Sequence, residues 1–273
     1  MIAPVVDAAW TAAHLDDVVL ADVRWYLDGR PGRAEYDRGH LPGAVFVELD
    51  DWLAAPASPE AGRHPLPDPE VFARGMRELG IGDDDTVVAY DDQGGVVAAR
   101  LVWMLRVTGH DAALLDGGIG AWEGALETAP AQRAPATFTA RPWPAEALAS
   151  PDDAADRANA VIDARQRERY LGEGPDPVDP RPGHIPGARS LPAREHLGPD
   201  GRLLDRDTLR ARFAAAGVDG ARRVVSYCGS GVTACHNLVV LEHAGLGTGR
   251  LYPGSWSQWS SDPERPAATG QES

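Results

Sequence analysis

The stretch Gly39-His40-Leu41-Pro42-Gly43-Ala44 recurs later in the chain as Gly183-His184-Ile185-Pro186-Gly187-Ala188, with one conservative change. Other runs repeat in the same order, at an offset of about 140 residues. The matching pairs are 19–24 with 160–165, 86–90 with 223–227, 115–118 with 252–255, and Trp122 with Trp259. An ordered internal repeat of this extent predicts two copies of one domain.

The repeat also predicts where the domains begin and end. We expect an N-terminal domain over residues 1–126, a linker over 127–146 and a C-terminal domain over 147–273. The linker holds four prolines, whose fixed φ and missing N–H favour a semi-extended connector. A chain of 273 residues is long for one domain and suits two.

Each half alternates short β-branched runs with longer helical patterns. Residues 87–90 and 224–227 are typical of buried parallel strands, because they are short, apolar and bounded by polar residues. This alternation predicts an α/β fold of two tandem domains, each with a central, mostly parallel sheet flanked by helices. Helices are expected over 69–79, 96–108, 205–216 and 232–244.

The charge balance excludes some partners. The chain carries 41 acidic and 26 basic residues, a formal net charge of −15, so nucleic acid and anionic membranes are not expected to bind it. It shows no secretory signal pattern and no apolar run long enough to span a bilayer. The two cysteines, Cys228 and Cys235, are expected to be free thiols, which favours the reducing cytoplasm. An anionic substrate would need a local positive site.

The two halves differ at the end of the matched strand. Cys228 stands where Asp91 stands, at the carboxyl end of a strand, where open α/β sheets bind ligands. The glycine-containing turn and helix start that follow Cys228 present N–H groups to an anion and favour the nucleophilic thiolate. Asp91 supplies an anion but no nucleophile, so we expect the first domain to be catalytically inactive. Cys235, inside an apolar helix, is expected to belong to the core.

The loop 228–234 resembles the active-site loop of 3-mercaptopyruvate sulfurtransferases and related two-domain rhodaneses. The repeated Gly-His motifs and the segment 254–259 are also similar to rhodanese signatures, and the resemblance covers nearly the whole chain. It implies an inactive first domain and an active second domain, with Cys228 as the catalytic residue. The other residues that it places at the site are Gly229, Ser230, Gly231, Val232 and Thr233, which bind substrate, and Trp256.

The resemblance also implies a substrate-binding arginine, and Arg169 matches it. The planar fork of a guanidinium suits a carboxylate or sulfonate. Mercaptopyruvate enzymes carry a second arginine further along the same segment, for which Arg181 is the candidate. Arg165 is instead expected to pair with acids inside its own domain, as Arg24 would in the first half.

Ser230 resembles one member of a Ser-His-Asp relay proposed for the mercaptopyruvate enzymes. The histidine of that relay matches His40. His40 and His184 can equally be structural, bonded to the backbone before their Pro-Gly turns, so both interpretations stay open for His40.

The expected reaction is sulfur transfer through a covalent intermediate. The Cys228 thiolate would take sulfur from thiosulfate or 3-mercaptopyruvate, form a persulfide, and pass the sulfur to cyanide, a small thiol or thioredoxin. The donor stays open. The second arginine of the mercaptopyruvate enzymes would fall on Val178 by spacing, which weakens that donor, and thiosulfate-preferring relatives carry basic residues where this loop has Gly229 and Ser230. Neither a metal nor another cofactor is expected, since no zinc-binding or nucleotide-binding pattern occurs.

Three other functions share parts of this pattern. A cysteine phosphatase needs Cys-x5-Arg, and the arginine position is Ala234 here. A redox enzyme of the Cys-x-x-Cys type lacks its second cysteine. The main alternative is a non-catalytic rhodanese-like binding or regulatory module.

Overall fold

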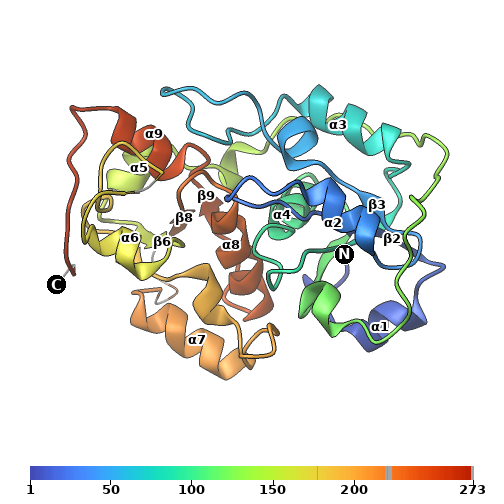
Figure 1. Ribbon diagram of the computed structural model, residues 1–273. Helices are drawn as coiled ribbons and strands as arrows, with labels where there is room; N and C mark the ends of the chain where they lie inside the picture. The colour runs from blue at the N-terminus through green and yellow to red at the C-terminus, as the bar shows by residue number, and fades with distance from the viewer. Residues whose placement is uncertain (177, 219, 221–222, 272–273) are drawn as a thin grey trace. The chain divides into compact units, whose positions relative to one another are not determined.

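The computed structural model describes residues 1–176, 178–218, 220 and 223–271, and the chain forms two compact units (Figure 1). Unit 1 comprises Met1–Ala55, Pro67–Trp143 and Leu197–Leu203. Unit 2 comprises Pro56–Leu66, Pro144–His196 and Leu204–Ser273. Within the described ranges, no helix combines the length and the apolar character needed to cross a lipid bilayer.

Unit 1 is built on a parallel sheet of five strands in the order β1-β5-β4-β2-β3. The strands are β1 (Val5–Val6), β2 (Val18–Asp22), β3 (Val45–Phe46), β4 (Thr86–Tyr90) and β5 (Ala112–Leu115). The helices are α1 (Ala8–Ala13), α2 (Gly32–Arg38), α3 (Pro69–Glu78) and α4 (Ala99–Val107), with a π-helical turn at Leu49–Leu53 and a 3₁₀ turn at Gly118–Ala121. The central strand β4 is buried on both faces, as its run of apolar residues predicted.

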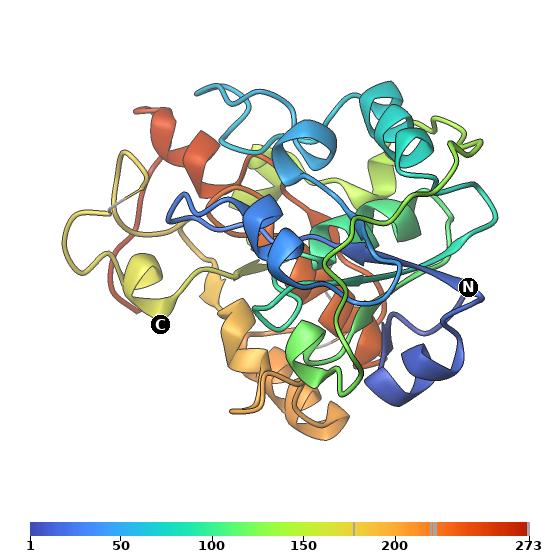
Figure 2. The same ribbon diagram turned by 45° about the vertical axis from the view of Figure 1, so that its right-hand side comes forward.

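Unit 2 repeats this plan with four parallel strands in the order β7-β6-β8-β9. The strands are β6 (Ala160–Asp163), β7 (Arg189–Ser190), β8 (Val224–Tyr227) and β9 (Arg250–Leu251). The helices are α5 (Pro151–Ala155), α6 (Arg167–Leu171), α7 (Arg206–Ala215), α8 (Thr233–His243) and α9 (Ser255–Ser261), with 3₁₀ turns at Ala145–Ala147 and Ala193–His196. Helix α8 packs on β8, and α7 packs on α8 (Figures 1 and 2). The predicted α/β fold with two parallel sheets is confirmed.

The repeated Gly-His motif has a structural cause in each unit. The His40 ring stacks on Tyr36 at 3.8 Å, and the His184 ring stacks on Tyr170 at the same distance. Each tyrosine hydroxyl donates to the carbonyl of the alanine that ends the motif, Ala44 or Ala188. The motif occurs in both halves of the chain because each unit uses it for the same local packing.

The Asp-x-Arg pairs serve the same purpose in both units. Arg24 bonds Asp22 and the Gly39 carbonyl, and Arg165 bonds Asp163 and the Gly183 carbonyl. The prediction that Arg165 pairs inside its domain is confirmed. The buried ion pairs tie the end of one strand to the start of the Gly-His motif.

Two segments depart from the boundaries that the repeat suggested. Residues 56–66, within the first half of the chain, belong to unit 2, and residues 197–203 belong to unit 1. The proline-rich linker is irregular but lies along unit 1: Phe138 is buried, and the Trp143 indole donates to the Pro67 carbonyl. The sequence repeat could not reveal these exchanges, because it marks where the copies match and not where the connecting loops pack.

Candidate active site

Cys228 lies at the carboxyl end of β8, just before α8 begins at Thr233. Its side chain is buried, with 2% of the residue exposed. The N–H of Gly231 donates to Cys228 Sγ at 3.1 Å, so the loop already directs a backbone donor at the sulfur. This is the arrangement that the glycine-containing turn predicted.

The turn depends on Gly231. Its φ is 82°, a left-handed conformation that side chains disfavour. A Cβ atom at this position would lie 2.6 Å from the Pro253 carbonyl oxygen, which is too close. Glycine is therefore required at this position for the loop to adopt the turn that directs the Gly231 N–H at the sulfur.

Helix α9 and the turn before it hold the backbone of the loop from the other side. The Cys228 N–H donates to Ser255 Oγ at 3.1 Å, and the Trp256 N–H donates to the Cys228 carbonyl at 2.9 Å. Ser255 Oγ in turn donates to the Tyr252 carbonyl at 2.9 Å. The backbone of Cys228 is thus held at both its N–H and its C=O.

The matching loop of unit 1 shows what such a turn can hold. The buried Asp91 carboxylate accepts four backbone N–H groups at 2.7 to 3.0 Å, from Gln93, Gly95, Val97 and Ala98. These N–H groups form an anion-binding nest around the carboxylate. Because the chain through residues 96–98 belongs to this nest, α4 begins at Ala99, three residues later than predicted. Asp91 is therefore a built-in anion in the nest where unit 2 has a sulfur.

The histidine beside Ser230 is His64. The Nδ1 atom of His64 and Ser230 Oγ are 2.7 Å apart, and both residues are buried. His40, the relay histidine suggested by the sequence, is a structural residue of unit 1: its ring nitrogens lie 2.8 Å from the Tyr36 carbonyl and 3.1 Å from that of Ala129. The histidine in contact with Ser230 is therefore His64 and not His40. His64 lies in the stretch 56–66, outside the repeated motifs, so the internal repeat could not reveal it.

Arg169 is placed at the site by the short helix α6. Its guanidinium bonds both oxygens of Asp176, at 3.0 and 3.2 Å, and reaches Asp179 Oδ2 at 2.5 Å. A Cβ atom built on Gly229 would lie 3.5 Å from Arg169 Nη1, so the guanidinium rests against the residue after Cys228. Burial alone would raise the pKa of Asp176, but hydrogen bonds from Arg169 and from nearby backbone N–H groups lower it below its usual value.

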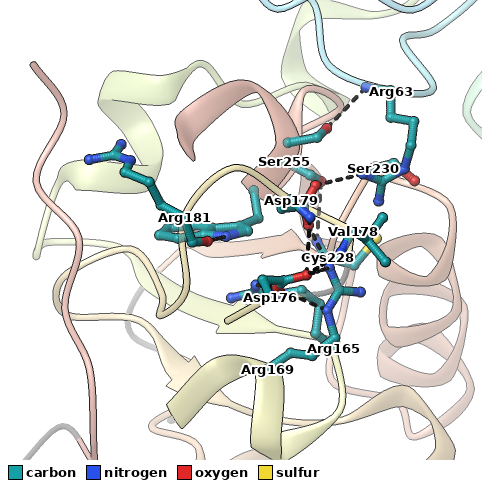
Figure 3. A network of polar contacts seen from close by, with 12 residues as sticks. Arg63, Arg165, Arg169, Asp176, Val178, Asp179, Arg181, Cys228, Ser230 and Ser255 are labelled. Carbon is teal, nitrogen blue, oxygen red and sulfur yellow. Dashed lines mark hydrogen bonds and ion pairs between the residues drawn. The ribbon is translucent and has the colours of Figure 1, made fainter. Parts of the chain in front are cut away.

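A second guanidinium at the loop escaped the sequence analysis. Arg63 Nη1 lies 2.5 Å from Asp179 Oδ1, and a Cβ atom on Gly229 would be 2.9 Å from Arg63 Nη2. The Arg63 N–H donates to Ser257 Oγ, which ties this segment to α9. Figure 3 shows Arg63 and Arg169 reaching Asp179 from different segments beside Cys228.

Arg181 and Trp256, by contrast, have structural contacts. The Arg181 guanidinium donates to four backbone carbonyls, those of Trp259, Ser260, Asp262 and Arg265, and points away from Cys228 (Figure 3). We therefore correct its assignment as the second substrate arginine. Trp256 is fully buried, donates to the Arg181 carbonyl at 2.9 Å and stacks against the Arg165 guanidinium. It supports the site from within the core.

Two further residues of the loop, for which the resemblance implied substrate binding, lie at the start of α8. Val232 is buried in the turn, and Thr233 begins α8. Cys235 is fully buried in α8, where its Sγ lies 3.3 Å from the Gly231 carbonyl oxygen. Both cysteines are free, as predicted.

Comparison with known proteins gives consistent matches over nearly the whole chain. The family model for the rhodanese-like domain matches residues 7–125 and 144–262. A probable 3-mercaptopyruvate sulfurtransferase of Pseudomonas aeruginosa is 42% identical over 98% of this chain and 99% of its own length. A putative thiosulfate sulfurtransferase of Mycobacterium tuberculosis is 40% identical over 93% of this chain and 92% of its own length.

Solved structures agree with the sequence matches. The crystal structure of SseA from Escherichia coli, described as a 3-mercaptopyruvate sulfotransferase with the rhodanese fold, superposes with a TM-score of 0.82. It is 34% identical, and the match covers 94% of this chain and all of that chain. The resemblance drawn from the sequence is confirmed, and the chain belongs to the rhodanese family, with two rhodanese-like domains in tandem.

Proposed function

We propose that this protein is a sulfurtransferase that carries sulfur as a persulfide on Cys228. The observation that carries the proposal is the Cys228 loop, in which Gly231 directs its N–H at Sγ while two guanidiniums lie against Gly229. A nucleophilic sulfur beside two guanidiniums suits a small anionic donor, because each guanidinium can present a planar pair of N–H groups to an anion. The relatives named above support this assignment, and because their names include both mercaptopyruvate and thiosulfate enzymes, both donors are candidates.

In the first half-reaction the Cys228 thiolate attacks the transferable sulfur of the donor. With thiosulfate, the S–S bond breaks, sulfite leaves with the bonding electrons, and a Cys228 persulfide anion remains. With 3-mercaptopyruvate, the C–S bond breaks, the enolate of pyruvate leaves, and a protonated persulfide forms. The enolate then takes a proton to become pyruvate. The scheme is two-step covalent catalysis and predicts ping-pong kinetics.

The loop is suited to hold the persulfide. In unit 1 the homologous nest binds the Asp91 carboxylate through four backbone N–H groups. A persulfide anion extends from Cys228 by one atom, as a carboxylate oxygen extends from its carbon. The comparison supports a nest for the outer sulfur. It also supports an inactive unit 1, with catalysis in unit 2, which includes residues 56–66 as well as most of the C-terminal domain predicted over 147–273.

Ser230 and His64 supply the proton that only one of the donors needs. Their contact of 2.7 Å allows the Ser230 hydroxyl to relay a proton, while the hydrogen bond to His64 stabilises the charge that develops on Ser230. Sulfite leaves as a stable anion and requires no such help. The pair therefore acts in the mercaptopyruvate reaction.

The acceptor takes the outer sulfur in the second half-reaction and returns Cys228 to the thiolate. Cyanide, a small thiol and reduced thioredoxin are all able to attack a persulfide. Two free cysteines suit a reducing compartment, and we assign the protein to the cytoplasm.

A two-donor assay tests the proposal. Purified protein is given thiosulfate with cyanide, and separately 3-mercaptopyruvate with a thiol. Cys228→Ser should abolish turnover and Cys235→Ser should retain it, because serine preserves the contact with the Gly231 carbonyl. Mass spectrometry after donor alone should show one added sulfur, on Cys228. Turnover that survives Cys228→Ser, or none with either donor, would favour the non-catalytic binding module.

A further inference from the structure

The Asp179 carboxylate sits between two guanidiniums at the mouth of the Cys228 loop. Its Oδ1 lies 2.5 Å from Arg63 Nη1, and its Oδ2 lies 2.5 Å from Arg169 Nη2. The Asp179 side chain is fully buried, whereas the Arg169 and Arg63 side chains are 16% and 25% exposed. One carboxylate therefore pairs with both arginines from the protein side, and both arginine side chains stay partly exposed.

Both guanidiniums lie where the anionic end of a donor would have to bind. A Cβ atom on Gly229, the residue after the nucleophile, would lie within 3.5 Å of each. Two forks that meet on a single planar carboxylate, one per oxygen, form a complete recognition site for that group. The Nε atom of Arg63 is buried and has no hydrogen-bond partner among the residues that the structure describes, so this arginine has a donor that Asp179 does not use.

We propose that Asp179 is a tethered stand-in for the donor's carboxylate or sulfonate group, held by Arg63 and Arg169 until the donor displaces it. Arg63 is then a donor-binding residue together with Arg169. This inference rests on the proposed function and adds how the donor enters its binding site. Exchange of one anion for another keeps both guanidiniums paired, which avoids the cost of an uncompensated charge.

The displaced state requires only a local movement. Asp176 also accepts from Arg169, and its own carboxylate accepts the backbone N–H groups of Val178 and Asp179 at 2.9 and 3.0 Å. Asp176 can therefore keep Arg169 aimed while the Asp179 side chain leaves. The donor competes with an internal anion, so its apparent affinity is reduced by the fraction of molecules in which the site is open.

The isosteric variant Asp179→Asn tests the competition. It removes the charge and keeps the shape, so the KM for the donor should fall on the order of tenfold, with kcat changed much less. Arg63→Gln should raise the KM by about the same factor, and Arg63→Lys should restore part of the loss. Asp28→Asn removes an equal charge from an exposed ion pair of unit 1 and is the matched control.

A binding measurement separates this inference from the sulfurtransferase assignment. Calorimetry with pyruvate and with sulfite, neither of which carries a transferable sulfur, reads the anion site without turnover, and thermal unfolding confirms that each variant is folded. Tighter binding of either anion by Asp179→Asn than by Asp28→Asn supports the proposal, even if neither donor is turned over. Unchanged or weaker binding of both anions by folded Asp179→Asn overturns it, even if Cys228 proves catalytic. Unaltered binding by Arg63→Gln overturns the role of Arg63.

Discussion

Ser255 Oγ accepts the backbone N–H of Cys228 at 3.1 Å while the Ser255 backbone itself is left-handed, with φ of 52°. It is the only non-glycine residue with positive φ in the part of the chain that the structure describes. Its counterpart in unit 1 is Gly118, with φ of 58°, and Asp91 there has no serine beside its N–H. The unit that contains Cys228 thus has a strained backbone at Ser255, whereas unit 1 has a glycine at the matching position.

The hydrogen bond between Ser255 and Cys228 predicts that a substitution at Ser255 can lower activity without lowering stability. Ser255→Gly should relieve about 1 kcal/mol of left-handed strain and lose a hydrogen bond of similar value, so the free energy of unfolding should change little. Sulfur transfer should fall, because the Cys228 N–H loses its partner. Ser255→Ala keeps the strain but loses the hydrogen bond, so it should also lower the free energy of unfolding, by about 1 to 2 kcal/mol. Urea unfolding and the two-donor assay measure both effects, and full activity in Ser255→Gly would refute the positioning role.

The contact between Ser230 and His64 predicts a donor-dependent defect. Ser230→Ala and His64→Gln should each lower kcat with 3-mercaptopyruvate by about 10²-fold, since a relay of this kind contributes that much. Turnover of thiosulfate should be affected far less, because sulfite leaves without a proton. The double variant should be no worse than the worse single one if the two residues act as a unit. Equal losses with both donors would instead indicate that the pair only shapes the loop.

The nest around Asp91 predicts a purely structural role for this carboxylate. Asp91→Asn leaves several buried N–H groups poorly paired and should lower the free energy of unfolding by about 3 kcal/mol. Activity per folded molecule should stay the same, because unit 1 has no nucleophile at this position. Asp37→Asn, in an exposed pair with Arg33, should cost less than about 1 kcal/mol and serves as the control. A loss of activity in folded Asp91→Asn would show that unit 1 contributes to catalysis.

The buried residue His196 predicts a pH-dependent loss of stability. Burial, aided by the nearby charge of His236, lowers the pKa of His196 to about 3. Its neutral form therefore stabilises the fold fully above its ordinary value near 6.5, and this contribution is lost as the pH falls from there toward 3. Between pH 7 and pH 5 the loss should be about 2 kcal/mol.

His196→Gln isolates that contribution, since glutamine keeps a group able to bond Asn237 and cannot be charged. Urea unfolding of both proteins at pH 7 and at pH 5 should show a smaller decline in the variant. If the two declines are equal, the histidine does not carry the effect.

The sequence comparison determined the architecture because a duplicated chain carries its own alignment. The repeated Gly-His motifs, the paired strands β4 and β8 and the Asp-x-Arg pairs all follow from local patterns that occur twice. Cys228 stood out for the same reason, since its equivalent is Asp91. Local chemistry was enough here, because a strand end, a glycine turn and a helix start are consecutive in the chain.

Only the tertiary structure decided the partners of Cys228 that come from distant segments. His64 and Arg63 lie in the stretch 56–66, which has no counterpart in the repeat and packs within unit 2. Arg181 and Arg63 are both arginines, and no sequence pattern shows that backbone carbonyls bind the first while Asp179 and the loop bind the second. Periodicity records which side chains share a strand or a helix, whereas contacts across more than a hundred residues depend on how the loops fold back.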